Sequence, residues 1–115
     1  MVLTARHAGT VAVIRLDGRL VLSPALQQLK TRIDKLIAAK TTSGLILDLS
    51  AVPDMDSAGV GELLTIHTSV TRRGLKVALA GVNRRVQEVL DITRLDGLFA
   101  ICQDEKSALE HLSQA

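Results

Sequence analysis

The sequence predicts an α/β fold in which a mixed, mostly parallel sheet of about five strands is flanked by about four helices. Apolar runs of strand length alternate with amphipathic segments of helical length, which predicts right-handed crossovers between parallel strands. Two runs at the start are joined by Gly9-Thr10, and this favours an antiparallel hairpin. With 115 residues, the chain has the length of one domain, so we expect a single unit over residues 1–115.

The first half of the chain is expected to contain three strands and one helix. Residues 2–8 and 11–16 form the predicted hairpin. Ser23-Pro24 is typical of a helix start, because Ser caps the first turn and Pro is tolerated at its first position. Apolar residues then recur at helical spacing as far as residue 37. Residues 45–49 are apolar apart from one Asp, which predicts a central buried strand.

The second half is expected to continue the alternation of helices and strands. A helix is predicted over residues 57–73 and a strand over residues 75–80. Asn83 and Asp104 are candidate N-caps of two further helices, with a short strand at residues 99–102 between them. This order of elements completes the predicted sheet and its flanking helices.

Composition excludes several function classes. Hydrophobic residues make up 47% of the chain, but Phe99 is its only Phe, Tyr or Trp, which argues against a stacking platform for single-stranded nucleic acid. The net charge of +2 is too small to indicate a nucleic-acid surface. The longest apolar runs have strand length, and no signal peptide is visible, so we expect a cytoplasmic protein without membrane insertion. Cys102 is the only cysteine, which excludes an intramolecular disulfide.

The functional residues are expected in the segment 53–61, which leaves the buried strand and opens the next helix. In open α/β sheets, sites form at the carboxyl ends of the strands. Ser57 begins the predicted helix, where free backbone N–H groups favour a phosphate. A structural alternative is that Ser57 or Asp56 is only an N-cap. Gly59 and Gly61 each cost the helix about 1 kcal/mol relative to Ala, so close packing or an approaching molecule must offset them.

Ser57 lacks the surroundings of a catalytic nucleophile. The nucleophile elbow of hydrolases has Gly two residues before Ser, and Met55 stands there in this chain. His67 lies on the same predicted helix, roughly 15 Å away at 1.5 Å per residue. The sequence contains no Gly-Lys-Ser/Thr phosphate loop and no Cys or His pair with metal spacing. We therefore expect no catalysis, no metal and no cofactor.

The remaining functional interpretation is that Ser57 accepts a phosphate from another protein. Phosphorylation adds about −1.5 to −2 charge. The helix N-terminus favours that charge, whereas Asp54 and Asp56 repel it. A folded helix should tolerate the group, but a partner surface pressed onto the same place should not. The expected result is a surface switch that blocks a complex and leaves the fold intact.

Taken in order, the segments resemble the sulfate transporter and anti-sigma factor antagonist (STAS) domains, specifically the bacterial anti-sigma factor antagonists. The specific piece is Met-Asp-Ser-Ala-Gly-Val-Gly at residues 55–61, after an apolar strand. Residues 16–20, 74–77, 95–99 and 104–109 add weaker likeness. The resemblance implies that the unphosphorylated protein binds an anti-sigma factor serine kinase and so releases a sigma factor. It also implies that the kinase phosphorylates Ser57, and that a phosphatase reverses the modification.

The resemblance implies a partner-binding surface that is made of the segment and of a neighbouring loop: Asp54, Met55, Asp56, Ser57, Ala58, Gly59, Val60, Leu22 and Ser23. Two departures bear on it. The family often has a second Ser or Thr after the acceptor, and Ala58 stands there, so Ser57 is the only hydroxyl of the motif. Val21 replaces a residue that is often polar or acidic. Val21 fits equally well a second hypothesis, a non-catalytic STAS adaptor in a signalling scaffold or a lipid-transport ATPase complex.

Overall fold

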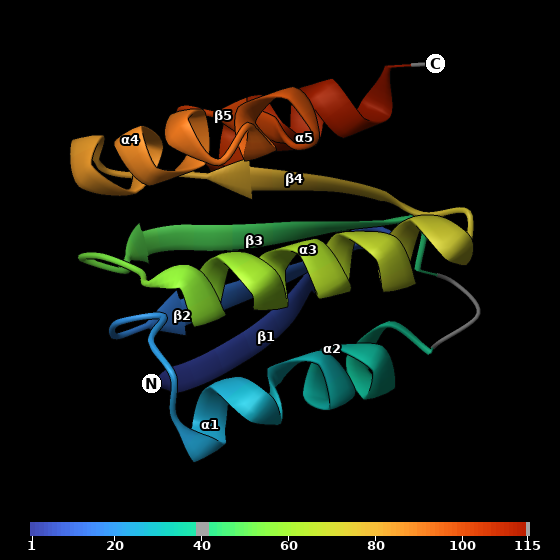
Figure 1. Ribbon diagram of the computed structural model, residues 1–115. Helices are drawn as coiled ribbons and strands as arrows, with labels where there is room; N and C mark the ends of the chain where they lie inside the picture. The colour runs from blue at the N-terminus through green and yellow to red at the C-terminus, as the bar shows by residue number, and fades with distance from the viewer. Residues whose placement is uncertain (39–41, 115) are drawn as a thin grey trace.

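The computed structural model describes residues 1–38 and 42–114 (Figure 1). Its strands are β1 (Val2–Ala8), β2 (Val11–Asp17), β3 (Gly44–Ala51), β4 (Lys76–Ala80) and β5 (Ala100–Cys102). Its helices are α1 (Pro24–Gln27), α2 (Leu29–Ile37), α3 (Ser57–Arg72), α4 (Arg84–Ile92) and α5 (Glu105–Ser113), and a single 3-10 turn, η1 (Leu95–Gly97), follows α4 within the described residues. The predicted α/β architecture is confirmed.

The strands form one mixed sheet in the order β1-β2-β3-β4-β5. β1 and β2 pair antiparallel as the predicted hairpin, and the other neighbouring strands pair parallel. β3 is the central strand, and Ile46 in it lies between Val13 of β2 and Ala78 of β4. Because β2, β3 and β4 run in the same direction, their carboxyl ends meet at one edge of the sheet.

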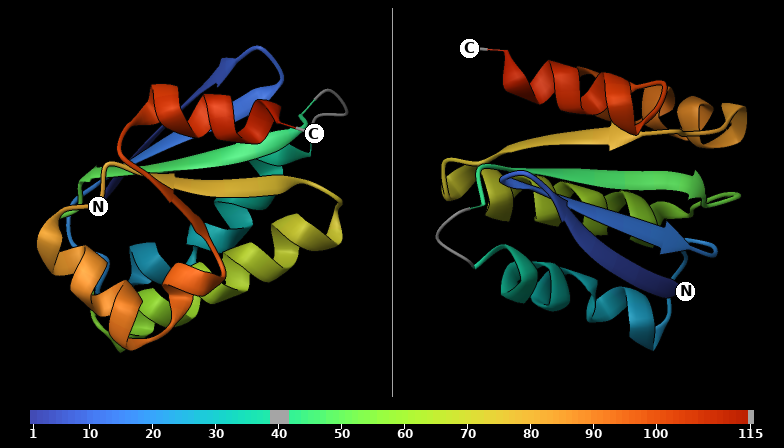
Figure 2. Two further views of the ribbon diagram at one scale, coloured as in Figure 1. Left: turned by 90° about the horizontal axis from the view of Figure 1, so that it is seen from above. Right: turned by 180° about the vertical axis from the view of Figure 1, so that it is seen from behind.

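Helices cover the two faces of the sheet unequally (Figure 2, left). The larger aliphatic core lies between one face and the helices α1 to α4, with side chains such as Leu47 from β3, Ile33 from α2, Leu63 from α3 and Leu90 from α4. α5 covers the other face, where the buried residues include the small side chains Ala78, Ala80 and Ala108. In the described part of the chain, no helix is long and apolar enough to cross a bilayer.

Helix starts follow the predicted caps. The side chain of Ser23 accepts a hydrogen bond from Leu26 N at 3.1 Å. Asn83 caps α4 through a bond from Val86 N at 2.8 Å, and Asp104 caps α5 through one from Ser107 N at 2.8 Å. These motifs were predictable because the cap side chain and the backbone N–H that donates to it lie within one turn of each other.

The predicted helix over residues 24–37 is divided at Gln28 into α1 and α2. The backbone N–H of Gln28 bonds the carbonyl of Ala25 at 3.3 Å, three residues back, as in a tightened 3-10 turn. The α-helical pattern then resumes, since Arg32 N bonds Gln28 O at 3.1 Å. The apolar residues keep their helical spacing on both sides of this turn, so the sequence pattern does not reveal the division of the helix.

Candidate functional site

The segment 53–61 lies at the carboxyl end of β3, where the chain enters α3. Asp56 is the N-cap of α3, because its Oδ1 accepts a hydrogen bond from Gly59 N at 3.0 Å. Ser57 is therefore the first residue of the helix, and it is exposed. None of the hydrogen bonds found among the described residues uses its hydroxyl. Of the two candidate caps in the sequence, Asp56 has the capping role and Ser57 does not.

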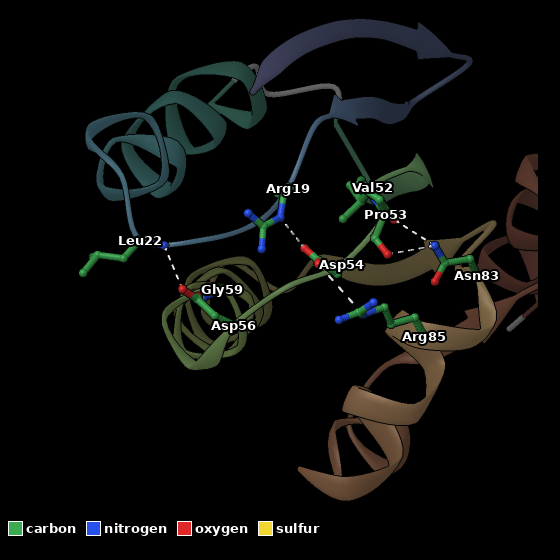
Figure 3. Close-up of polar contacts among 9 residues, drawn as sticks. All are labelled: Arg19, Leu22, Val52, Pro53, Asp54, Asp56, Gly59, Asn83 and Arg85. Carbon is green, nitrogen blue, oxygen red and sulfur yellow. Dashed lines mark hydrogen bonds and ion pairs between the residues drawn. The ribbon is translucent and has the colours of Figure 1, made fainter.

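The second carboxylate oxygen of Asp56 holds the loop between β2 and α1 (Figure 3). Its Oδ2 accepts a hydrogen bond from Leu22 N at 3.1 Å. Two backbone bonds join the same segments, from Leu20 N to Asp54 O at 3.1 Å and from Asp56 N to Leu20 O at 3.2 Å. Leu22 and Ser23 are thus brought beside the α3 N-terminus, and the side chain of Leu22 is largely exposed there.

The hydrogen bonds to Asp56 also set its protonation. The N–H of Gly59, and after it that of Leu22, lower the pKa of the Asp56 carboxyl, because both donate to its ionised form. Asp56 is therefore a carboxylate at neutral pH. It gives the α3 N-terminus a fixed negative charge next to Ser57.

The two glycines of the first turn have different surroundings. A Cβ atom on Gly59 would lie 2.2 Å from the backbone carbonyl oxygen of Leu20. A Cβ atom on Gly61 would meet nothing within 4 Å. The absence of a side chain at Gly59 is therefore required by close packing against the β2–α1 loop, which is one of the two reasons that the sequence suggested. Gly61 has no such structural requirement and lies exposed on α3.

Asp54 lies between two arginines from different parts of the chain (Figure 3). Arg19 Nε lies 2.8 Å from Asp54 Oδ1, and Arg85 Nε lies 3.9 Å from Asp54 Oδ2. The hydrogen bond from Arg19 lowers the pKa of Asp54, and the Asp54 carboxylate raises that of Arg19. Sequence reasoning treated Asp54 as an unscreened charge that repels a phosphate. The structure corrects this, because both arginines offset the charge of the carboxylate.

Asn83 connects the site to the next loop along the sheet. Its Nδ2 donates to the backbone carbonyls of Val52 at 3.3 Å and Pro53 at 3.1 Å, while its Oδ1 caps α4. The sequence predicted only the capping role of Asn83 and not its bonds to the β3–α3 loop.

Arg19 and Arg85 were missed altogether as site residues. Arg19 follows the end of β2, and Arg85 lies in the first turn of α4. Their position in the sequence was the available signal. Each residue follows the carboxyl end of a strand that pairs with β3, β2 for Arg19 and β4 for Arg85.

Other chemistry-bearing residues take structural places. The ring of His67 packs edge-on against Phe99 with the ring centroids 5.0 Å apart. Burial raises the pKa of the half-buried Cys102 thiol, which makes it a poorer nucleophile. Within residues 1–38 and 42–114, no group of three or more His, Cys, Asp or Glu residues could hold a metal ion.

Known proteins resemble this chain in sequence and in fold. The STAS domain family matches residues 3–108. The anti-sigma F factor antagonist of Paenibacillus polymyxa is 27% identical over 106 residues, which cover 92% of this chain and 90% of that protein. A crystal structure of an anti-sigma factor antagonist from Mycobacterium paratuberculosis has a TM-score of 0.83 at 18% identity, covering 98% of this chain and 94% of that one.

A second solved structure is the phosphorylated form of SpoIIAA, a Bacillus cell fate determinant. It has a TM-score of 0.72 at 22% identity, covering 96% of this chain and 98% of that one. At these identities the structures show a shared fold. The family match extends from β1 into α5 and includes the whole β3–α3 segment. The chain therefore belongs to the STAS domain family, and its relatives include anti-sigma factor antagonists.

Proposed function

We propose that this protein is an anti-sigma factor antagonist whose unphosphorylated form binds an anti-sigma factor serine kinase and thereby releases a sigma factor. Phosphorylation of Ser57 by that kinase ends the complex. The observation that carries the proposal is that two different residues cap and begin α3. Asp56 caps the helix, while the exposed Ser57 begins it with a hydroxyl that the described hydrogen bonds leave unused.

Phosphate on Ser57 would act on the surface and leave the fold intact. A phosphate at the first position of a helix is favoured by the backbone N–H groups and the helix dipole. The Asp56 carboxylate opposes it, but the charge of Asp54 is already offset by Arg19 and Arg85. The added charge of about −2 therefore falls on a partner-facing surface, where desolvating it on complex formation is costly.

The nine proposed partner-binding residues fall into three groups by burial. Met55 and Gly59 are buried, so they support the loop from beneath. Leu22, Asp56 and Ser57 are exposed and would contact the partner directly. The remaining residues lie between these extremes: Asp54, Ala58, Val60 and Ser23. Leu22 is 67% exposed beside the acceptor serine, which makes it the apolar anchor that we propose for the complex.

The test is phosphorylation followed by binding. The chain is incubated with ATP and the serine kinases encoded beside its gene, and the phosphorylated residue is found by mass spectrometry. We expect phosphate on Ser57. Ser57→Ala should bind the kinase and resist release, and Ser57→Asp should bind at least about tenfold more weakly, because the charge is then permanent. Equal binding of both variants, or no phosphate on Ser57 with any of these kinases, would refute the proposal.

In the proposed function, this protein catalyses no step of its own. Ser57 receives a phosphoryl group from ATP that the kinase holds, and a phosphatase returns the serine. The alternative function, an adaptor in a scaffold or transport complex, predicts a different partner on affinity purification: an ATPase or a large multimer in place of a small kinase. A generic ester substrate should remain unhydrolysed, since no His approaches Ser57 among the described hydrogen bonds.

A further inference from the structure

A groove runs between α2 and α3 on the exposed side of α3. Its volume is about 550 Å³. The lining residues come mostly from the second half of α3: Lys30, Leu64, Thr65, Thr68, Ser69, Arg72 and Arg73. Leu64 is 46% exposed there and supplies an apolar contact.

The groove continues the surface on which Ser57 lies. Ser57, Gly61, Leu64 and Thr68 follow one another at helical spacing, so they share one face of α3. The exposed Gly61 leaves open space between Ser57 and Leu64. The hydroxyl of Thr68 donates to Leu64 O at 3.1 Å, so its proton is already used within the helix. A molecule that covers Ser57 can therefore extend along this face without meeting a protruding side chain at residue 61.

The charge of the groove is positive. Three of its lining side chains are cations, and none is a carboxylate. Asp34 lies beside it, but that carboxylate is engaged by Lys30 at 2.6 Å, by the Ser69 hydroxyl at 2.7 Å and by Arg73 at 4.0 Å. These contacts lower the pKa of Asp34 despite its partial burial.

Glu62 and Arg72 also bear on the net charge of the groove. Burial raises the pKa of the Glu62 carboxyl, although the charge of Lys30 acts in the opposite direction. Arg72 forms no ion pair among the described residues, and it is an exposed residue of the groove lining. Arg72 is therefore the cation whose charge is least offset by the protein itself.

We propose that this groove docks an acidic segment of the protein partner that covers Ser57. The segment places carboxylates near Arg72 and an apolar side chain on Leu64. Charge complementarity selects this occupant, because the lining offers three cations around one exposed leucine. The inference rests on the proposed function and adds a second contact, which extends from about two to about four helical turns from the acceptor serine at 3.6 residues per turn.

The test is the affinity of the Arg72→Glu variant for the kinase that phosphorylates Ser57, measured without ATP. We expect the Kd to rise about tenfold at low salt, mainly through slower association, and the effect to shrink at about 0.5 M salt. Thr68→Glu, which places a carboxylate in the groove, should weaken binding in the same way. Lys106→Glu is the matched control, since it makes the same charge change on α5, which covers the opposite face of the sheet. It should bind like the wild type.

The outcomes separate this inference from the proposed function. Wild-type affinity of Arg72→Glu, in a preparation where Ser57→Asp no longer binds, overturns the groove and leaves the phosphorylation switch standing. Equal weakening by Arg72→Glu and Lys106→Glu overturns it too, because only net charge would then matter. If the free chain dimerises in sedimentation and Arg72→Glu abolishes the dimer, the occupant is a second copy and the proposal is wrong. A wild-type chain that binds no kinase refutes both.

Discussion

Gly59 and Gly61 are two residues apart in the first turns of α3, yet their roles differ at the level of single atoms. At Gly59 an added Cβ would collide with the backbone oxygen of Leu20, and at Gly61 it would enter open space. Helix propensity treats the two positions alike, since each glycine costs about 1 kcal/mol relative to Ala. The tertiary contact thus explains one glycine, and the proposed partner contact explains the other.

Alanine at these two positions should change stability in opposite directions. Gly59→Ala should lower the free energy of unfolding by roughly 1–3 kcal/mol, because backbone must move to admit the methyl group. Gly61→Ala should raise it by about 0.5–1 kcal/mol through helix propensity alone. Urea denaturation followed by circular dichroism measures both, and each variant is the control for the other. Two changes of the same sign would contradict the geometry.

Asp56 should make stability depend on acid pH. Its folded-state pKa lies below the usual 3.8, so folding favours the ionised form. The contribution is complete above the unfolded pKa and is lost as the pH falls through the lower, folded pKa. Asp56→Asn should keep one cap acceptor but lose the charge and the bond from Leu22 N. We expect this variant to be less stable than the wild type at neutral pH.

The difference between Asp56→Asn and the wild type should narrow as the pH falls below about 4, because the wild-type carboxyl then becomes protonated. Urea denaturation at a series of pH values measures it. Other carboxylates with lowered pKa values, such as Asp104, are present in both proteins and cancel in the comparison. A constant difference across the whole range would show that the charge of Asp56 does not stabilise the fold.

At the scale of elements, helix starts were predictable and helix interiors less so. Ser23, Asn83 and Asp104 cap their helices as the sequence indicated, because a cap needs only its own first turn. The division between α1 and α2 at Gln28 and the 3-10 turn after α4 were not predicted. Apolar spacing reports which face is buried and says little about a local change from α to 3-10 geometry.

Asn83 joins two elements, and its replacement should show both roles. Asn83→Ala removes the α4 cap and the bonds to the carbonyls of Val52 and Pro53, so we expect a loss of about 1–2 kcal/mol in the free energy of unfolding. Asn83→Asp keeps a cap acceptor but lacks the amide donor, so its loss should be smaller. Thermal unfolding of both variants measures the two contributions. Equal losses would mean that the cap contributes nothing.

At the scale of the whole molecule, the carboxyl edge of the sheet assembles the site from three connections. The loops after β2 and β3 supply Arg19 and Asp54, and the first turn of α4, which follows β4, supplies Arg85. These residues are far apart in sequence and meet in one ion-pair group (Figure 3). Among the described helices, α5 alone covers the face of the sheet opposite to α1, α2, α3 and α4 (Figure 2, left). The phosphate that we propose on Ser57 would therefore lie at this carboxyl edge of the sheet.

Ser57→Asp should leave the fold unchanged while it prevents the complex. Ser57 is exposed and its hydroxyl supports none of the described hydrogen bonds, so we expect the free energy of unfolding to stay within about 0.5 kcal/mol of the wild type. Amide NMR shifts should change only near the α3 N-terminus and the β2–α1 loop. Ser57→Ala serves as the control for the lost hydroxyl. Widespread shifts or a large loss of stability would show a switch that works by refolding.

The sequence by itself determined the order of the elements, the helix caps, the buried β3 strand and the place of Ser57 at the start of α3. Each of these follows from local patterns, because periodicity and capping involve residues within a few positions of one another. Only the tertiary structure decided that Asp56 also holds Leu22, that Leu20 requires Gly59, and that Arg19 and Arg85 offset Asp54. Those contacts join residues roughly 30 or more positions apart, and chain folding alone brings them together.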